Sequence, residues 1–179
     1  MEQTTWILMT YKVPPEPAAK RVALWRRLKG MGAVYLQNGV CLLPQTDEHM
    51  RQLKMLENDA AEMGGETVLL VTTSSDKAQE DKVIARFKAD RDDQYREFIG
   101  KCDAFEAEIA KEIAIEKFTY AELEEEDNEL KKLQSWIGKI RGLDFYGAPL
   151  AATASERLTA CEELLADYAR RVFDANQGL

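Results

Sequence analysis

The side chains best suited to ligand binding are basic residues within one short segment. Residues 18–31 contain no acidic residue and carry Lys20, Arg21, Arg26, Arg27 and Lys29. Basic side chains clustered along one helix are typical of surfaces that bind nucleic-acid phosphates. This is the one basic concentration in the chain, so these five residues are the candidate DNA-binding residues.

The same segment predicts a helix whose apolar face is formed by Leu24, Leu28 and Met31. At about 100° per residue, Arg26 and Arg27 point away from that face, whereas Arg21 falls inside it. Two interpretations of Arg21 follow. It is structural, with its stem on apolar surface or its charge paired with an acid, or it contacts a base edge or a partner. Trp25, at the edge of the apolar face, is predicted to belong to the core.

Acidic residues are densest at Glu122–Asp127, with Glu129 just beyond. Paired carboxylates can bind metal ions or transfer protons. This run, however, follows the capping-box sequence Thr119-Tyr120-Ala121-Glu122, and acids near a helix N-terminus complement the helix dipole. We therefore expect a solvent-exposed acidic face at this position.

Metal-binding and nucleophilic residues are few and scattered. The cysteines are Cys41, Cys102 and Cys161, and His49 is the single histidine, whereas a zinc site needs about four such ligands close together. We expect the cysteines to be small buried hydrophobes. The sequence has no glycine-rich phosphate loop, and Ser74-Ser75 lacks the glycines of a nucleophile elbow. No metal, cofactor or catalytic residue is therefore predicted.

Charge is divided unevenly along the 179 residues, which carry 24 basic and 32 acidic side chains and a net charge of −8. Residues 1–75 hold eight of each sign, and residues 76–179 hold sixteen basic and twenty-four acidic ones. The net negative charge of the whole chain argues against a protein that coats nucleic acid in bulk, because such a protein must neutralise phosphates. No apolar segment reaches membrane-spanning length, and no basic residue precedes the short apolar segment at Trp6–Met9. We expect a cytoplasmic protein that makes no membrane contact.

The elements that must position the basic residues alternate in the first half. Strands are predicted at 6–13, 33–37, 40–43 and 66–72, with helices at 18–31 and, capped by Asp47, at 48–63. Asn38-Gly39 between two short strands is a strong hairpin signal. The order strand, helix, strand, strand, helix, strand predicts a ferredoxin-like domain over residues 1–75.

The second half changes to helical periodicity. Helices are expected at 77–87, at 91–117, after Thr119, and after a cap at Thr153, and no strand is expected beyond residue 76. Apolar side chains repeat every seven residues, and Trp136 also lies on such a stripe. The expected seams are Tyr95, Cys102 and Ile109, then Leu123, Leu130 and Ile137, and finally Leu158, Cys161, Leu165, Tyr168 and Val172. Residues 76–179 should form an antiparallel coiled-coil-like bundle, giving an α+β fold overall.

The chain resembles the N-terminal region of the chromate resistance protein ChrB family. The resemblance rests on Trp6-Ile-Leu-Met-Thr-Tyr-Lys-Val-Pro14, Arg21-Val-Ala-Leu-Trp-Arg-Arg-Leu28, Gly64-Gly65-Glu66 and Phe118-Thr-Tyr-Ala-Glu-Leu-Glu-Glu125. More faintly, the first half is similar to the ferredoxin-like domain of PaaX-type repressors and of the small CRISPR adaptation nuclease. That nuclease carries an aspartate at the end of its first strand, where this chain has Tyr11.

The resemblance implies a chromate-responsive transcriptional regulator that associates with DNA. The family has a further C-terminal domain with no counterpart in residues 1–179, which leaves chromate sensing by this chain open. Our first hypothesis is a non-enzymatic regulatory module that binds DNA as a homodimer. The second is a dimerising scaffold whose acidic helices bind a protein partner. An enzyme of unknown chemistry is the third and has the least support in the sequence.

Overall fold

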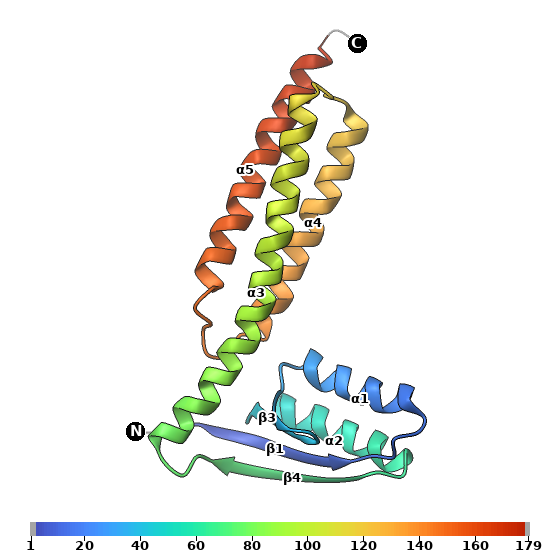
Figure 1. Ribbon diagram of the computed structural model, residues 1–179, viewed down its shortest axis with the longest axis vertical. Helices are drawn as coiled ribbons and strands as arrows, with labels where there is room; N and C mark the ends of the chain where they lie inside the picture. Colours follow the sequence, from blue (N-terminus) through green and yellow to red (C-terminus); the bar gives the residue numbers. More distant parts are fainter. Residues whose placement is uncertain (1–2, 178–179) are drawn as a thin grey trace. The chain divides into compact units, whose positions relative to one another are not determined.

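A computed structural model of the chain describes residues 3–177 and shows two compact units, residues 1–90 and residues 91–179. Figure 1 shows the helices and strands in chain order. Their bounds are β1 Thr5–Lys12, α1 Ala18–Gly30, β2 Val34–Gln37, β3 Val40–Pro44, α2 Asp47–Glu62, β4 Glu66–Thr73, α3 Lys77–Ala114, α4 Tyr120–Gly142 and α5 Ala151–Ala175.

The four strands form one antiparallel sheet in the order β2-β3-β1-β4. In the centre, Leu8 of β1 pairs with Leu42 of β3 on one side and with Leu70 of β4 on the other. Gly39, in the turn between β2 and β3, has a φ of 73°, and a Cβ there would approach the carbonyl oxygen of Tyr11 to 2.5 Å. Only glycine fits such a turn without strain. Strand order and turn confirm the ferredoxin-like prediction.

Helices α1 and α2 cover one face of this sheet (Figure 1). The strand register places Ile7, Met9 and Leu43 on that face, and all three are buried. Helix α1 contributes Leu24 and Leu28 to the core, and α2 contributes Leu53, Leu56 and Ala60. The N-cap of α2 is Thr46, whose hydroxyl accepts a hydrogen bond from the backbone N–H of His49. The predicted cap at Asp47 is therefore wrong by one residue, since both side chains can serve this role.

The first turns of α3 are hydrogen-bonded to the sheet and to the residue that precedes β1. The Glu80 carboxylate accepts from the backbone N–H of Thr4 at 2.8 Å, and Arg86 donates to the carbonyl oxygen of Tyr35 at 2.7 Å. Phe87, in the following turn, is buried. The first unit therefore extends to Asp90, beyond the boundary predicted at residue 75. The prediction ended the unit after its last strand, whereas long-range contacts join the first turns of α3 to it.

Helix α3 is one 38-residue helix where the sequence pattern predicted two. The three residues between the predicted helices are Lys88, Ala89 and Asp90. None is a glycine or proline, so the backbone continues in helical conformation. Among residues 3–177 no strand occurs after Thr73, as predicted.

The second unit packs the rest of α3 against α4 and α5, which Figure 1 shows side by side. Thr119 caps α4 by accepting from the backbone N–H of Glu122 at 3.2 Å, as expected. The predicted cap of α5 at Thr153 is wrong, because α5 begins at Ala151. The carboxylate of Asp92 on α3 instead accepts from the backbone N–H of Leu150 at 2.9 Å, a partner no local pattern reveals.

The predicted seams form the core of this unit, with Leu123 and Trp136 partly buried at its edge. Its buried members are Tyr95, Phe98, Cys102, Phe105, Ile109, Leu130, Leu133, Ile137, Ile140, Ala148, Ala154, Leu158, Cys161, Leu165, Tyr168 and Val172. The acidic run after Thr119 departs from the expected exposed face most clearly at Glu126, which is only 4% exposed. No helix within residues 3–177 is both long and apolar enough to cross a membrane.

Candidate functional site

Acidic side chains divide the five predicted DNA-binding residues of α1 into two groups. Arg27 forms an ion pair with Asp59 of α2, and the Nζ of Lys29 lies 3.3 Å from the Asp90 carboxylate. Lys20, Arg21 and Arg26 are exposed, and the described part of the chain offers none of them an acidic partner. Three of the five cations are therefore uncompensated.

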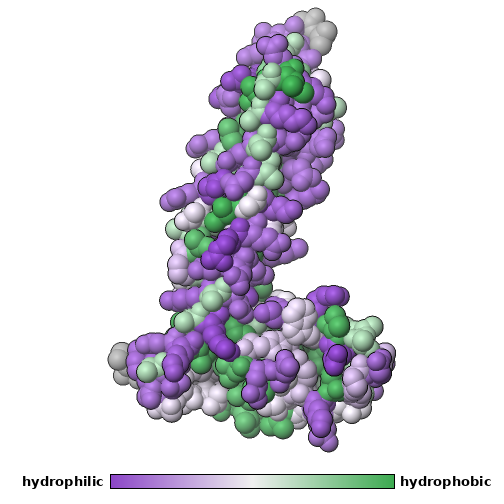
Figure 2. All heavy atoms as spheres, in the orientation of Figure 1, coloured by the Kyte–Doolittle hydropathy of each residue, from purple (hydrophilic) through white to green (hydrophobic). Residues whose placement is uncertain are grey.

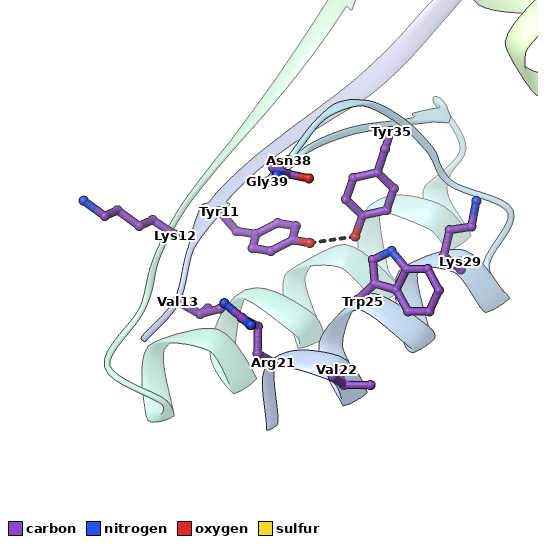
Figure 3. Close-up of a pocket in the computed structure, with 10 residues that line it drawn as sticks. All are labelled: Tyr11, Lys12, Val13, Arg21, Val22, Trp25, Lys29, Tyr35, Asn38 and Gly39. Atoms are coloured by element: carbon purple, nitrogen blue, oxygen red, sulfur yellow. Dashed lines mark hydrogen bonds between the residues drawn. The ribbon is translucent and has the colours of Figure 1, made fainter. Parts of the chain in front are cut away.

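The same residues also face different sides of α1. Arg21 and Lys29 line an open hollow of about 640 Å³, which we call the α1 hollow (Figure 3). Its wall is formed by Tyr11, Lys12, Val13, Arg21, Val22, Trp25, Lys29, Tyr35, Asn38 and Gly39, and contains no acidic residue. Lys20 and Arg27 instead border a smaller depression that also contains Asp59 and Glu62. The five residues do not form one site.

Two tyrosine hydroxyls meet in the middle of the α1 hollow. Figure 3 shows Tyr11 and Tyr35 pointing at each other, with their oxygens 2.7 Å apart and their rings nearly perpendicular at 84°. Partial burial raises the pKa of both phenols. Both therefore stay protonated near neutral pH. Because one hydroxyl donates to the other, the accepting hydroxyl keeps a hydrogen that it can donate to a ligand.

The indole of Trp25 forms an accessible wall of the α1 hollow. It is 48% exposed, so the prediction that Trp25 belongs to the core is wrong. Leu24 and Leu28 alone turn fully inward from α1, which leaves Trp25 at the side of the helix beside Tyr35 (Figure 3). Arg21 lies four residues earlier, one helical turn away on the same side. An exposed indole next to a guanidinium can stack on a planar ring while the cation holds a phosphate.

Sequence reasoning missed the hollow's strand residues. Lys12 ends β1 and extends away from the other lining residues into solvent (Figure 3). Tyr35 comes from β2, and the Asn38-Gly39 turn closes one end. The hairpin itself was predicted from the sequence. Its position beside the end of β1 follows only from the sheet order, in which β3 pairs with β1.

The three cysteines are buried and unpaired, as expected for small core residues. Burial raises the pKa of Cys41 and of Cys161 to about 12 and raises that of Cys102 as well. A thiolate is the nucleophilic form of cysteine. At neutral pH these side chains are thiols within the core and offer no reactive sulfur.

Comparison with known proteins places the chain in a family. A family model described as the N-terminal region of protein ChrB matches residues 21–179. The chain belongs to the ChrB family. Protein ChrB of Cupriavidus metallidurans is 32% identical over 97 residues, which cover 54% of this chain and 29% of that relative. The matched stretch thus spans less than a third of that protein's length.

The ChrB match covers most of the α1 hollow. It begins at Arg21 and therefore includes Trp25, Lys29, Tyr35 and the Asn38-Gly39 turn, whereas the β1 residues of the hollow lie before it. The whole helical unit also falls within the ChrB match. The family assignment thus covers both units, although the matching model does not include β1.

Proposed function

We propose that this chain is a DNA-associated regulatory module of the ChrB family, active in chromate resistance and without catalytic activity of its own. The observation that carries the proposal is the acid-free lining of the α1 hollow, where Arg21 lies one helical turn from the exposed indole of Trp25 and Lys12 extends from the outer edge into solvent (Figure 3). Cations together with hydroxyl donors are the groups that hold phosphates in protein–DNA complexes.

The charge distribution supports contact through the first unit. Residues 1–90 carry twelve basic and twelve acidic side chains, and residues 91–179 carry twelve and twenty. The second unit therefore repels phosphate. In the proposed complex, Arg21 binds the backbone beside Trp25, Lys12 binds it from the end of β1, and Lys20 and Arg26 extend the basic surface along α1.

A homodimer is part of the proposal, because one small basic surface binds DNA weakly and two copies related by a dyad double the contacts. Strand β4 is an edge strand whose Val68, Leu70 and Val71 are each at least half exposed. Figure 2 shows apolar side chains gathered along this side of the first unit. Exposed apolar edge strands are prone to pair with another chain. Light scattering on the wild type and on Leu70→Lys measures whether β4 holds the dimer.

The test of DNA contact is affinity against salt concentration. The probe is a fluorescent duplex from the region upstream of the chain's own operon, with and without chromate. Replacing Lys12 and Arg21 together by glutamine should weaken binding and lower the salt slope by about 0.9 for each lost phosphate contact. The matched control replaces Lys54 and Lys82, exposed cations of the same unit that lie outside the hollow.

Equal losses in the two double variants would mean that only net charge matters and would contradict a specific role for the α1 hollow. An unchanged affinity in a folded Lys12/Arg21 variant would remove the hollow from the DNA interface. Absence of duplex binding by the wild type would reject the regulatory module.

A protein-interaction scaffold is the second candidate, favoured by an exposed aromatic pair in the acidic unit. Tyr120 and Phe173 are both more than half exposed, with ring centroids 5.7 Å apart. Exposed aromatic residues are enriched where proteins bind one another. If the wild type does not bind DNA, this acidic surface with its exposed aromatic pair becomes the leading candidate for the functional site. Its expected partner is a basic protein.

A further inference from the structure

A second hollow lies within the helical unit, between α3 and α4. It has a volume of about 440 Å³, within the usual range for small-molecule sites. We call it the α3–α4 hollow, and it is lined by Lys101, Ala104, Phe105, Glu108, Glu125, Glu126, Glu129, Lys132, Leu133 and Trp136. Neither the DNA proposal nor the scaffold proposal uses it.

Glu126 is the most unusual residue of this hollow. It is only 4% exposed, yet within the described residues it has neither a hydrogen-bond partner nor a cation. The charged groups that act on it are Glu108, Glu125, Glu112 and Glu122, all acidic. Burial first, and then repulsion by these neighbours, raises the pKa of Glu126 to about 7. A buried carboxylate without a partner is costly unless a ligand or a proton neutralises it.

Three of the neighbouring acids differ from Glu126 in having a lysine partner. Glu122 pairs with Lys117, Glu129 pairs with Lys132 at 2.7 Å, and Glu108 lies 3.8 Å from Lys111. Glu125 is exposed at the rim.

The buried groups that interact with Glu126 from α3 and α5 do not neutralise it either. Glu112 of α3 is 3% exposed, and one of its carboxylate oxygens has no hydrogen-bond partner. From α5, the Tyr168 hydroxyl donates to the carbonyl oxygen of Lys117 at 2.6 Å. Glu126 therefore faces the hollow as an uncompensated acid.

The rest of the wall is suited to an organic cation. Phe105 and Leu133 are buried apolar side chains, and Trp136 is held edge-on to Phe98 at a centroid distance of 5.8 Å. Aromatic rings beside a carboxylate bind ammonium groups through cation–π attraction and ion pairing together. No group of three or more metal-ligating side chains is placed to hold an ion within the described residues.

The lysines of the hollow restrict the number of charges on the ligand. Lys101 and Lys132 both line it, and the ammonium of Lys132 already neutralises Glu129. A second positive charge on a ligand would meet these ammonium groups. One cationic centre on an apolar stem suits the wall better than a polyamine does.

We propose that the α3–α4 hollow binds a small organic monocation, with its ammonium group against the Glu126 carboxylate and its apolar stem against Phe105 and Trp136. This binding site does not depend on the proposed DNA function. The ligand binds the ionised form of Glu126, so binding displaces the proton that this side chain holds at lower pH.

The test is isothermal titration of the full chain with benzylammonium, and with benzyl alcohol as the neutral probe of similar shape. We expect saturable binding of benzylammonium only. The affinity should fall about tenfold from pH 8 to pH 6, because protonation of Glu126 competes with the ligand. Titrations in buffers of different ionisation enthalpy should show nearly one proton released per ligand at pH 6 and almost none at pH 8.

Glu126→Gln keeps the shape of the side chain and removes its charge, so it should weaken benzylammonium binding at least about tenfold. Glu124→Gln, on the exposed side of the same helix, is the matched control and should bind as the wild type does. Thermal melts show whether both variants fold. The proton-release measurement needs no variant. If Glu126→Gln is unstable, this measurement alone tests whether the ligand binds at Glu126.

Any of the following outcomes would overturn the proposal. They are no saturable binding of benzylammonium by the wild type, equal binding of benzyl alcohol, or unchanged binding by folded Glu126→Gln. Binding without proton release at pH 6 would likewise show that the ammonium lies away from Glu126.

Discussion

The two hollows use similar kinds of residue with opposite charge. Each places a tryptophan in the same wall as charged side chains, with Arg21 and Trp25 in one and Glu126 and Trp136 in the other. The cations of the first unit reach solvent, whereas the acid of the second is buried. The first hollow is therefore suited to a large anion that approaches from outside, and the second to a small cation that enters.

Local pairing explains this difference better than composition does. Several acids of the helical unit form ion pairs with a lysine or arginine three or four residues away, as in Asp127 with Lys131 and Asp167 with Arg171. Such pairs are exposed and contribute little to stability. The net charge of the unit therefore says less about ligand binding than Glu126, which is buried and has no cation beside it.

The largest expected effect tests whether the helical unit depends on its apolar seam rather than on its charges. Ile137→Ala removes a side chain that is 1% exposed and should lower the free energy of unfolding by about 2–5 kcal/mol. Chemical denaturation measures this loss. The exposed Glu124→Gln should change stability far less, and similar losses from both would show that the acidic face is structural.

A smaller effect should distinguish the buried acid from the exposed ones. Because the folded-state pKa of Glu126 is raised from 4.5 to about 7, its ionisation lowers wild-type stability as pH rises through that interval. Glu126→Gln removes this cost. The variant should exceed the wild type by about 1–3 kcal/mol at pH 8 and by little at pH 4. Denaturation midpoints across this range give the difference, and a constant gap would contradict a buried, titrating Glu126.

The smallest expected effect concerns the paired cation of α1. Asp59→Asn removes the acid that pairs with Arg27, and the exposed pair itself contributes less than about 1 kcal/mol to folding. If DNA contacts this side of α1, the freed Arg27 should increase the salt slope by up to about 0.9. Anisotropy titrations measure this slope. An unchanged slope would confine DNA contact to the side of α1 that carries Arg21.

Most of the fold was predictable because hydrophobic period and turn residues are local signals. The alternation of apolar and polar residues, the Asn38-Gly39 turn and the heptad seams predicted each strand and the positions of most helices. The missed details depend on distant residues, such as the continuation of α3 past Asp90 and the start of α5, where Asp92 supplies the hydrogen bond. A side chain that caps a helix from another element leaves no pattern in the sequence around that helix.

The candidate site was less predictable than the fold. The sequence alone identified the basic helix, but it treated five residues as one surface and placed Trp25 in the core. Which of the cations have an acidic partner depends on α2 and on the end of the first unit, through Asp59 and Asp90.

The sequence by itself determined which elements form, because backbone preferences and apolar spacing act over a few residues. Tertiary structure alone decided which charges remain without a partner. Arg21 is left exposed beside Trp25 and Tyr35 by the packing of α1 on the sheet, and Glu126 is buried by the packing of α4 on its neighbours. The free-energy cost of keeping a side chain charged depends on its burial and on the nearest opposite charge. Both are set by segments that lie far apart in the chain.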